Sequence, residues 1–147
     1  MFQRAFSNLD TRRWFDRMYP QTLAIATWLL YLNALFAFLD FLDGRDIFGF
    51  WRIEGGLGAL LSFIVVVSHV LGGFLMANGK MLGWWLALVA AFGPLVLRLL
   101  WKITVYSPVS LQWVVNGGSW LNFMFEAALV ALLLHPQSRS HAKTWFR

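Results

Sequence analysis

Long apolar stretches separated by short polar segments are the dominant pattern along this chain. Residues 21–39, 57–76, 81–100 and 119–134 are almost entirely apolar, and the last stretch ends before Pro136. Helices usually end ahead of a proline, and about 20 apolar residues suffice to cross a hydrocarbon core of ~30 Å. The pattern predicts an all-α membrane protein with four transmembrane helices.

The first twenty residues are too polar to span a membrane, but their pattern is that of an amphipathic helix. On a helical wheel the residues of one side are Trp14, Phe15, Met18 and Tyr19, and those of the other are Arg12, Arg13, Asp16 and Arg17. Asp10 or Thr11 is a suitable N-cap. We expect a short helix over residues 10–19 in the membrane interface, with its arginines toward the headgroups. A docking helix for a partner protein is the alternative.

The distribution of lysine and arginine predicts the orientation. With both termini inside, eight of the twelve basic residues lie on the cytoplasmic side: Arg4, Arg12, Arg13, Arg17, Lys80, Arg139, Lys143 and Arg147. The outer side then holds Arg45, Arg52, Arg98 and Lys102. This excess obeys the positive-inside rule. We therefore expect both termini in the cytoplasm and residues 1–147 as a single domain of a plasma membrane, specifically a bacterial inner membrane.

Two connecting segments need separate interpretation. In residues 40–56 the aspartates at 40, 43 and 46 lack the spacing of a calcium loop, so we expect a solvated turn followed by an apolar part that dips into the interface. Leu111–Val115, within residues 102–118, is either an interfacial turn or the first half of a span broken at Asn116, Gly117 and Gly118. We favour the interfacial turn.

Composition supports a membrane protein and excludes several functions. Hydrophobic residues make up 59% of the chain and charged residues only 13%, against roughly 25% charged in soluble domains. There is no cysteine, which excludes disulfides, thiolate metal sites and cysteine nucleophiles. No basic patch with interleaved aromatic residues indicates nucleic acid. No nucleophile–base pair is evident either, so we do not expect an enzyme.

A set of polar residues lies within the apolar stretches, at similar expected depths. Glu126 and His69 lie about 12–13 Å from the cytoplasmic ends of their spans at ~1.5 Å per residue, and Asn33 and Asn122 lie deeper. Asn122 and Glu126 share one helical face, as do Ser62 and His69. The sequence thus predicts an intramembrane polar seam, consisting of Asn33, Ser62, His69, Asn122 and Glu126.

The seam has a functional and a structural interpretation. Movement of a proton or cation would use Glu126, with His69 as a relay. Alternatively, the polar groups simply hydrogen-bond between helices or to a neighbouring subunit, which is the commoner case. A second hypothesis for His69 is a haem or chlorin ligand, because Gly72 and Gly73 lie one turn away and leave room for a flat macrocycle.

Arg98 and Lys102 lie four residues apart beside Trp101, at the outer end of the third span. Snorkelling to the membrane surface explains both side chains, and a phosphate or lipid headgroup site is the more specific alternative. A contact between Arg98 and Glu126 is at the limit of what the arginine side chain can reach, because the two residues differ by about 12 Å in expected depth.

The function we expect from the sequence is that of a non-catalytic accessory subunit packed against a larger membrane complex. Its expected partners are membrane lipids and other integral membrane subunits. The alternatives are a small oligomeric transporter or channel for protons or cations that uses Glu126, and a pigment- or haem-bearing subunit that uses His69.

Overall fold

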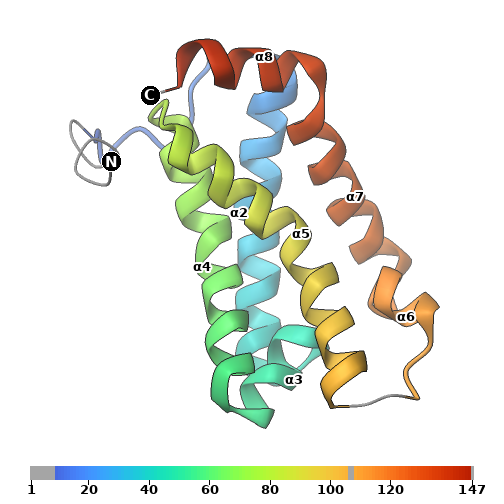
Figure 1. Ribbon diagram of the computed structural model, residues 1–147. Helices are drawn as coiled ribbons and strands as arrows, with labels where there is room; N and C mark the ends of the chain where they lie inside the picture. The colour runs from blue at the N-terminus through green and yellow to red at the C-terminus, as the bar shows by residue number, and fades with distance from the viewer. Residues whose placement is uncertain (1–8, 106–107, 147) are drawn as a thin grey trace.

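The computed structural model describes residues 9–105 and 108–146, in which every regular element is an α-helix. Among these residues four longer helices and three shorter ones are present. The longer helices run side by side, and the shorter ones lie at the two ends of this bundle (Figure 1). The longer helices are α2 (Gln21–Asp43), α4 (Gly56–Ala77), α5 (Met81–Thr104) and α7 (Trp120–Leu134). The shorter helices are α3 (Asp46–Glu54), α6 (Leu111–Asn116) and α8 (Pro136–Trp145).

Among the described residues, three helical segments are long and apolar enough to cross a membrane. They are Gln21–Glu54, which combines α2 and α3, then Gly56–Ala77 and Met81–Thr104. Helix α7 is apolar but has only 15 residues, or about 22 Å at 1.5 Å per residue. The fold is therefore a helical bundle with three candidate spans, which supports a place in a membrane.

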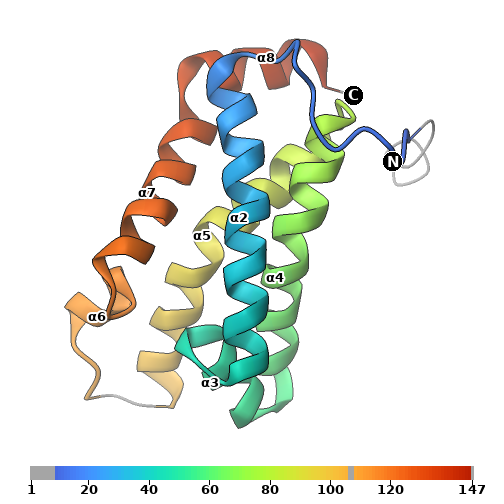
Figure 2. The same ribbon diagram turned by 180° about the vertical axis from the view of Figure 1, so that it is seen from behind.

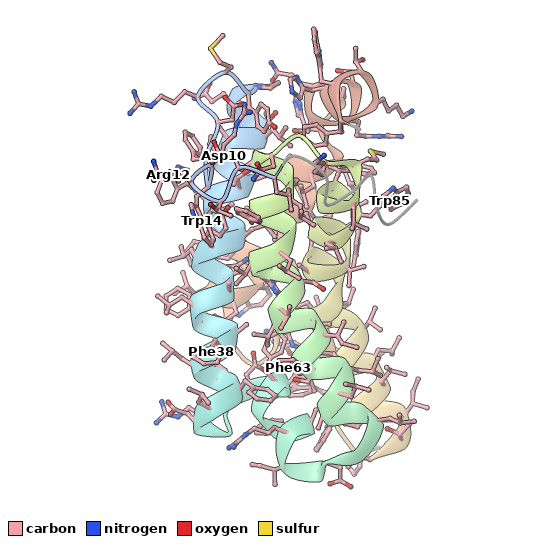
Figure 3. All side chains as sticks on the ribbon, turned by 90° about the vertical axis from the view of Figure 1, so that its left-hand side faces the viewer. Asp10, Arg12, Trp14, Phe38, Phe63 and Trp85 are labelled. Carbon is pink, nitrogen blue, oxygen red and sulfur yellow. The ribbon has the colours of Figure 1, made fainter. Side chains whose placement is uncertain are left out.

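The outer faces of the bundle are apolar. Phe38 on α2 and Trp85 on α5 are 48% and 56% exposed, and they lie at opposite edges of the view in Figure 3. Many other leucine, isoleucine and phenylalanine side chains are exposed along α2, α4 and α5. Soluble proteins rarely expose contiguous apolar surface of this extent. Lipid chains are the environment that suits such a surface.

Helices α4 and α5 pack closely because glycines remove side chains from their contact. A Cβ atom on Gly72 would lie 2.8 Å from the backbone nitrogen of Ala87, and one on Gly83 would lie 2.3 Å from that of Met76. Gly93 is equally restricted, since its Cβ would lie 2.3 Å from a methyl of Val65. Small residues thus allow two backbones to approach, as is common in membrane bundles.

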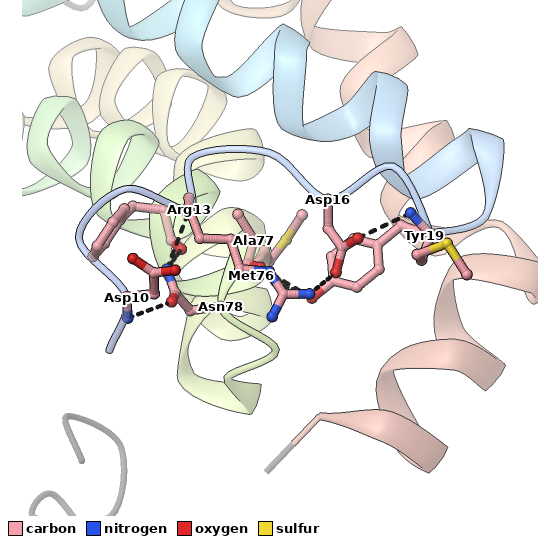
Figure 4. Close-up of polar contacts among 9 residues, drawn as sticks. Asp10, Arg13, Asp16, Tyr19, Met76, Ala77 and Asn78 are labelled. Carbon is pink, nitrogen blue, oxygen red and sulfur yellow. Dashed lines mark hydrogen bonds and ion pairs between the residues drawn. The ribbon is translucent and has the colours of Figure 1, made fainter. Parts of the chain in front are cut away.

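The N-terminal segment differs from the expected amphipathic helix. Residues 9–20 form turns rather than a helix, and they run from the start of α2 to the end of α4 (Figure 2). The backbone N–H of Asp10 donates to Asn78 Oδ1 over 2.9 Å, and Asn78 Nδ2 donates to the carbonyl of Arg13 (Figure 4). The prediction of a helix over 10–19 is wrong. Asp10 and Asp16 each accept a backbone N–H two residues on, and such turns compete with helix formation.

The segment after α2 forms a helix that packs inside the bundle end instead of a solvated loop. Gly44 ends α2 in the left-handed conformation (φ 70°), and α3 then turns back and packs against α2, α4 and α5 at this end of the bundle (Figure 1). Ile47, Phe48 and Trp51 are buried, and Trp51 Nε1 donates to the carbonyl of Leu97 over 3.1 Å. The expected turn around residue 43 is present, but the apolar part fills the core rather than the membrane interface.

Candidate functional site: a polar cavity inside the bundle

A small cavity lies between α2, α3, α4, α5 and α7. Its volume is about 50 Å³, which is room for a few water molecules at about 10–15 Å³ of such volume each. The lining residues are Asn33, Phe36, Ala37 and Asp40 of α2, Asp46 and Phe48 of α3, His69 of α4, Ala90, Ala91 and Pro94 of α5, and Asn122, Phe125, Glu126 and Leu129 of α7. Polar groups from four of the five helices thus meet in an otherwise apolar bundle.

Arg98 of α5 lies beside the cavity and binds Glu126 with two nitrogens. Its Nη1 is 2.9 Å from Oε2 and its Nη2 is 2.5 Å from Oε1, and the arginine side chain is completely buried. Two parallel charge-assisted hydrogen bonds are the strongest way for an arginine to hold a carboxylate. This pair therefore joins α5 to α7 and keeps Glu126 in one orientation.

Asp46, the first residue of α3, is the second carboxylate close to Arg98. Its Oδ2 lies 3.6 Å from Nη2, and its Oδ1 is buried without a hydrogen-bond partner among the described residues. The backbone of Asp46 has φ 46°, the only positive φ of a non-glycine residue that the structure describes. Such a conformation is uncommon and often marks a functional position.

His69 faces the cavity from α4 with one ring nitrogen already engaged. Its Nδ1 lies 2.8 Å from the carbonyl oxygen of Val65, and only 3% of the residue is exposed. Because a carbonyl can only accept, Nδ1 carries the proton in this contact, which leaves Nε2 of the neutral ring as an acceptor. On α5, Pro94 has no N–H to donate to the carbonyl of Ala90, four residues earlier. This carbonyl oxygen is a second possible hydrogen-bond acceptor next to the cavity, besides His69 Nε2.

The cavity brings together most of the seam expected from the sequence. Asn33, His69, Asn122 and Glu126 all line it. Ser62 does not: it is buried two turns away along α4, and it donates to the carbonyl of Phe48 over 3.0 Å. Ser62 thus fixes α3 against α4 instead of contributing to the cavity.

The residues around His69 do not fit a haem or chlorin. The space beside Gly72 is filled by the backbone of Ala87, and a Cβ on Gly73 would lie 2.7 Å from the Tyr31 ring. A cavity of about 50 Å³ is also far too small for a macrocycle. The two glycines serve helix packing, so we derive no chemistry from such a group.

The expectation for Arg98 requires correction. Its side chain is 0% exposed and is bound to Glu126, so it neither snorkels nor offers donors to a lipid headgroup. Arg98 reaches Glu126 despite their different expected depths, because α5 crosses the bundle obliquely (Figure 1) and because an arginine side chain is long. Lys102 donates to the carbonyl of Val109, and its role at a headgroup stays a prediction.

Asp40 and Asp46 are cavity residues that the sequence analysis missed. Both were attributed to a solvated turn, whereas both line the cavity with Glu126. One signal was present: Asp46 directly precedes the apolar run from Ile47 to Trp51. When such a run packs in the core, the residue directly before it is brought close to the core as well.

Comparisons of the chain with protein-family models, with curated proteins and with solved structures find no match.

Proposed function

We propose that this chain is a small helical membrane protein that binds and moves protons through the cavity between α2 and α7. The observation that carries the proposal is the charge of the cavity. The buried cation Arg98 lies within 4 Å of two carboxylates, those of Asp46 and Glu126, and a third carboxylate, that of Asp40, also lines the cavity. An excess of negative charge is costly away from water, and a bound proton is the simplest way to remove that cost.

The cavity residues divide into a fixed pair and an exchangeable group. Glu126 is held by two hydrogen bonds from Arg98, so we now regard it as the counter-charge and not as the proton carrier. Asp46 has a buried oxygen without a hydrogen-bond partner in the described part of the chain, and it is the better carrier. Asp40 and His69 line the same cavity, and a few waters suffice to connect them. No group of three or more ligating side chains suited to a metal ion exists among the described residues, which favours protons over metal ions.

The proposal includes the finer topology expected from the sequence. In it α7 is the fourth transmembrane helix, the two termini lie in the cytoplasm and the membrane is a bacterial inner membrane. Supporting this, the N-terminal segment and α8 lie at the same end of the bundle (Figure 1). The short connection through α6 leaves α7 with 15 residues, so the bilayer has to thin locally or α6 has to complete the crossing.

The test is a proton-flux assay on the full chain in lipid vesicles that enclose a pH-sensitive dye. We expect the native chain to dissipate an imposed pH gradient and Asp46→Asn to slow this by about 10²-fold, the lower end of what a positioned proton-transfer group contributes. Asp43→Asn is the matched control, because Asp43 is exposed and outside the cavity. Equal rates for the native chain and Asp46→Asn would exclude the proposal.

A second candidate is the non-catalytic accessory subunit. The observation that favours it is the sparse packing of α7, in which only Leu129 and Leu133 are buried and Trp120, Leu121 and Met124 are each more than 60% exposed. A neighbouring membrane subunit is one way to cover this face. Sizing of the protein from native membranes in mild detergent tests it, since migration alone or as a small homo-oligomer excludes a larger complex.

A further inference from the structure

A second pocket, here called the end pocket, lies at the end of the bundle that carries the N-terminal segment and α8, opposite α3 (Figure 1). Its volume is about 830 Å³. Met18 and Trp145 at its rim are 88% and 69% exposed, so water reaches the pocket from this end. The lining residues are Arg13, Asp16, Met18, Tyr19 and Pro20, then Asn78, Gly79 and Lys80, and finally His141, Trp145 and Phe146.

An apolar cluster, here called the seal, extends from the polar cavity to the end pocket. Its members Ala90, Ala91 and Leu129 line the polar cavity, and Phe146 lines the end pocket. From Ala90 back to Trp84 the seal covers about 9 Å along α5, at 1.5 Å per residue. Apolar constrictions of this kind stop conduction as long as they stay dry. The other buried members of the seal are Leu23, Ala26, Leu30, Met76, Trp84, Ala87, Leu133 and Ala142.

Trp84 places one unpaired polar group inside the seal. Its Nε1 is buried and has no hydrogen-bond partner among the residues that the structure describes, and the residue is only 8% exposed. Buried donors without a partner are rare in native structures, and a water molecule or a functional role usually accounts for them. Water that enters the seal would hydrogen-bond to this N–H, so Trp84 marks the place where the apolar layer is easiest to wet.

His141 is the group on the far side of the seal that is suited to take up a proton. Its Nε2 is buried without a hydrogen-bond partner in the described part of the chain. Its ring lies 5.1 Å from that of Tyr19 and 5.7 Å from that of Phe146, which is part of the seal. Burial lowers the pKa of His141, with the carboxylate of Asp16 opposing this, so the ring is neutral at pH 7 and one nitrogen is an acceptor.

The other titratable and charged groups of the end pocket are less suited to carry a proton. Burial raises the pKa of Tyr19 to about 12, and its hydroxyl donates to the carbonyl of Met76 over 2.7 Å (Figure 4). Tyr19 therefore keeps its proton at neutral pH. Asp16 is paired with Arg13, and Lys80 has an interaction of its own.

We propose that His141 is the proton-binding residue on the far side of the seal, so that the proton path runs from the polar cavity past Trp84 to the end pocket. This inference rests on the proposed function of the polar cavity. While the seal is dry, the two compartments are separate. When water enters the seal, a proton passes from the cavity water to the free nitrogen of His141. The ring then releases a proton to the water of the end pocket and becomes neutral again.

The experiment is the same proton-flux assay on the full chain in lipid vesicles. We expect His141→Gln to slow the dissipation of the pH gradient about 10²-fold, the lower end of what a positioned proton-transfer group contributes. His141→Phe keeps an aromatic ring beside Tyr19 but has no nitrogen, so it should be equally slow. A purely structural role of the ring predicts the native rate for His141→Phe, and that result overturns the proposal. His135→Gln is the matched control, because His135 is exposed and outside the end pocket.

Leu30→Ala tests the seal itself and decides if the His141 variants do not fold. Leu30 is 0% exposed within the seal, and Leu75, at 1%, is equally buried but is not a member of it. We expect faster dissipation in Leu30→Ala, because the space left in the apolar layer admits water, and the native rate in Leu75→Ala. If the native chain conducts, equal rates in these two variants overturn this inference alone. A native chain that conducts no protons overturns the proposed function and this inference together.

Discussion

Arg98→Met is expected to destabilise the protein by about 3–5 kcal/mol, the cost of removing one partner from a buried ion pair. The substitution leaves the carboxylates of Glu126 and Asp46 inside the bundle without their cation. Glu126→Leu alone should also destabilise, because Arg98 is 0% exposed and, among the described residues, then keeps only its 3.6 Å contact to Asp46 and its 3.5 Å contact to the Val115 carbonyl. Unfolding in detergent, followed by tryptophan fluorescence, measures both effects.

The double variant Arg98→Met/Glu126→Leu separates the pair from general damage to the core. We expect it to be more stable than the sum of the single effects implies, with a coupling energy of about 0.5–3 kcal/mol, since neither charge is then left alone. Arg13→Met is the surface control: Arg13 is 47% exposed in its pair with Asp16, and such pairs contribute about 0–1 kcal/mol. Additive single effects would show that Arg98 and Glu126 do not interact.

Gly117→Ala is expected to disrupt the ion pair between Arg98 and Glu126 by crowding the guanidinium of Arg98. Gly117 ends α6 with φ 62°, and a Cβ there would lie 2.7 Å from Arg98 Cζ. The left-handed backbone costs an alanine about 1–2 kcal/mol, and overpacking the guanidinium adds about 1–3 kcal/mol. The same fluorescence measurement should therefore report a loss of several kcal/mol.

Gly118→Ala is the matched control for this effect. Gly118 also has a positive φ, 79°, but a Cβ there would meet nothing closer than Trp113 Cδ1 at 3.5 Å. The difference between the two variants thus isolates the contact with Arg98 from the backbone strain that they share. Equal losses would indicate that Gly117 does not pack on the guanidinium.

The long helices could be predicted from the sequence, within one residue at each end for α4 and α7, whereas α2 and α5 extend to Asp43 and Thr104, beyond the expected ends at residues 39 and 100. Spans expected at 57–76 and 81–100 correspond to α4 (Gly56–Ala77) and α5 (Met81–Thr104). Uninterrupted apolar runs between glycine, asparagine and proline leave little choice of where a helix begins or ends. Four of the five expected seam residues also line one cavity, because the helices that carry them run side by side.

The charged partners inside the bundle could not be predicted in this way. Sequence position gives depth only for a straight, upright helix, whereas tilt depends on packing against neighbours. Arg98 therefore reaches Glu126 although residue counting separated them. Asp46 escaped notice for a related reason: α3 folds back into the bundle, and the apolar run that follows Asp46 is equally compatible with an interfacial loop.

The most direct test of a water-accessible polar cavity inside a lipid-embedded bundle is cysteine accessibility, which suits a chain without native cysteine. Single variants Asn33→Cys and Asn122→Cys place a thiol on the cavity, and Leu35→Cys and Leu121→Cys place one on outer faces that are 54% and 61% exposed. Thiols react with small charged reagents as thiolates, which need water. In lipid vesicles we predict rapid modification at 33 and 122 and almost none at 35 and 121. Modification at 33 and 122 as slow as at 35 and 121 would contradict the cavity, and rapid modification at 35 and 121 would contradict the membrane embedding.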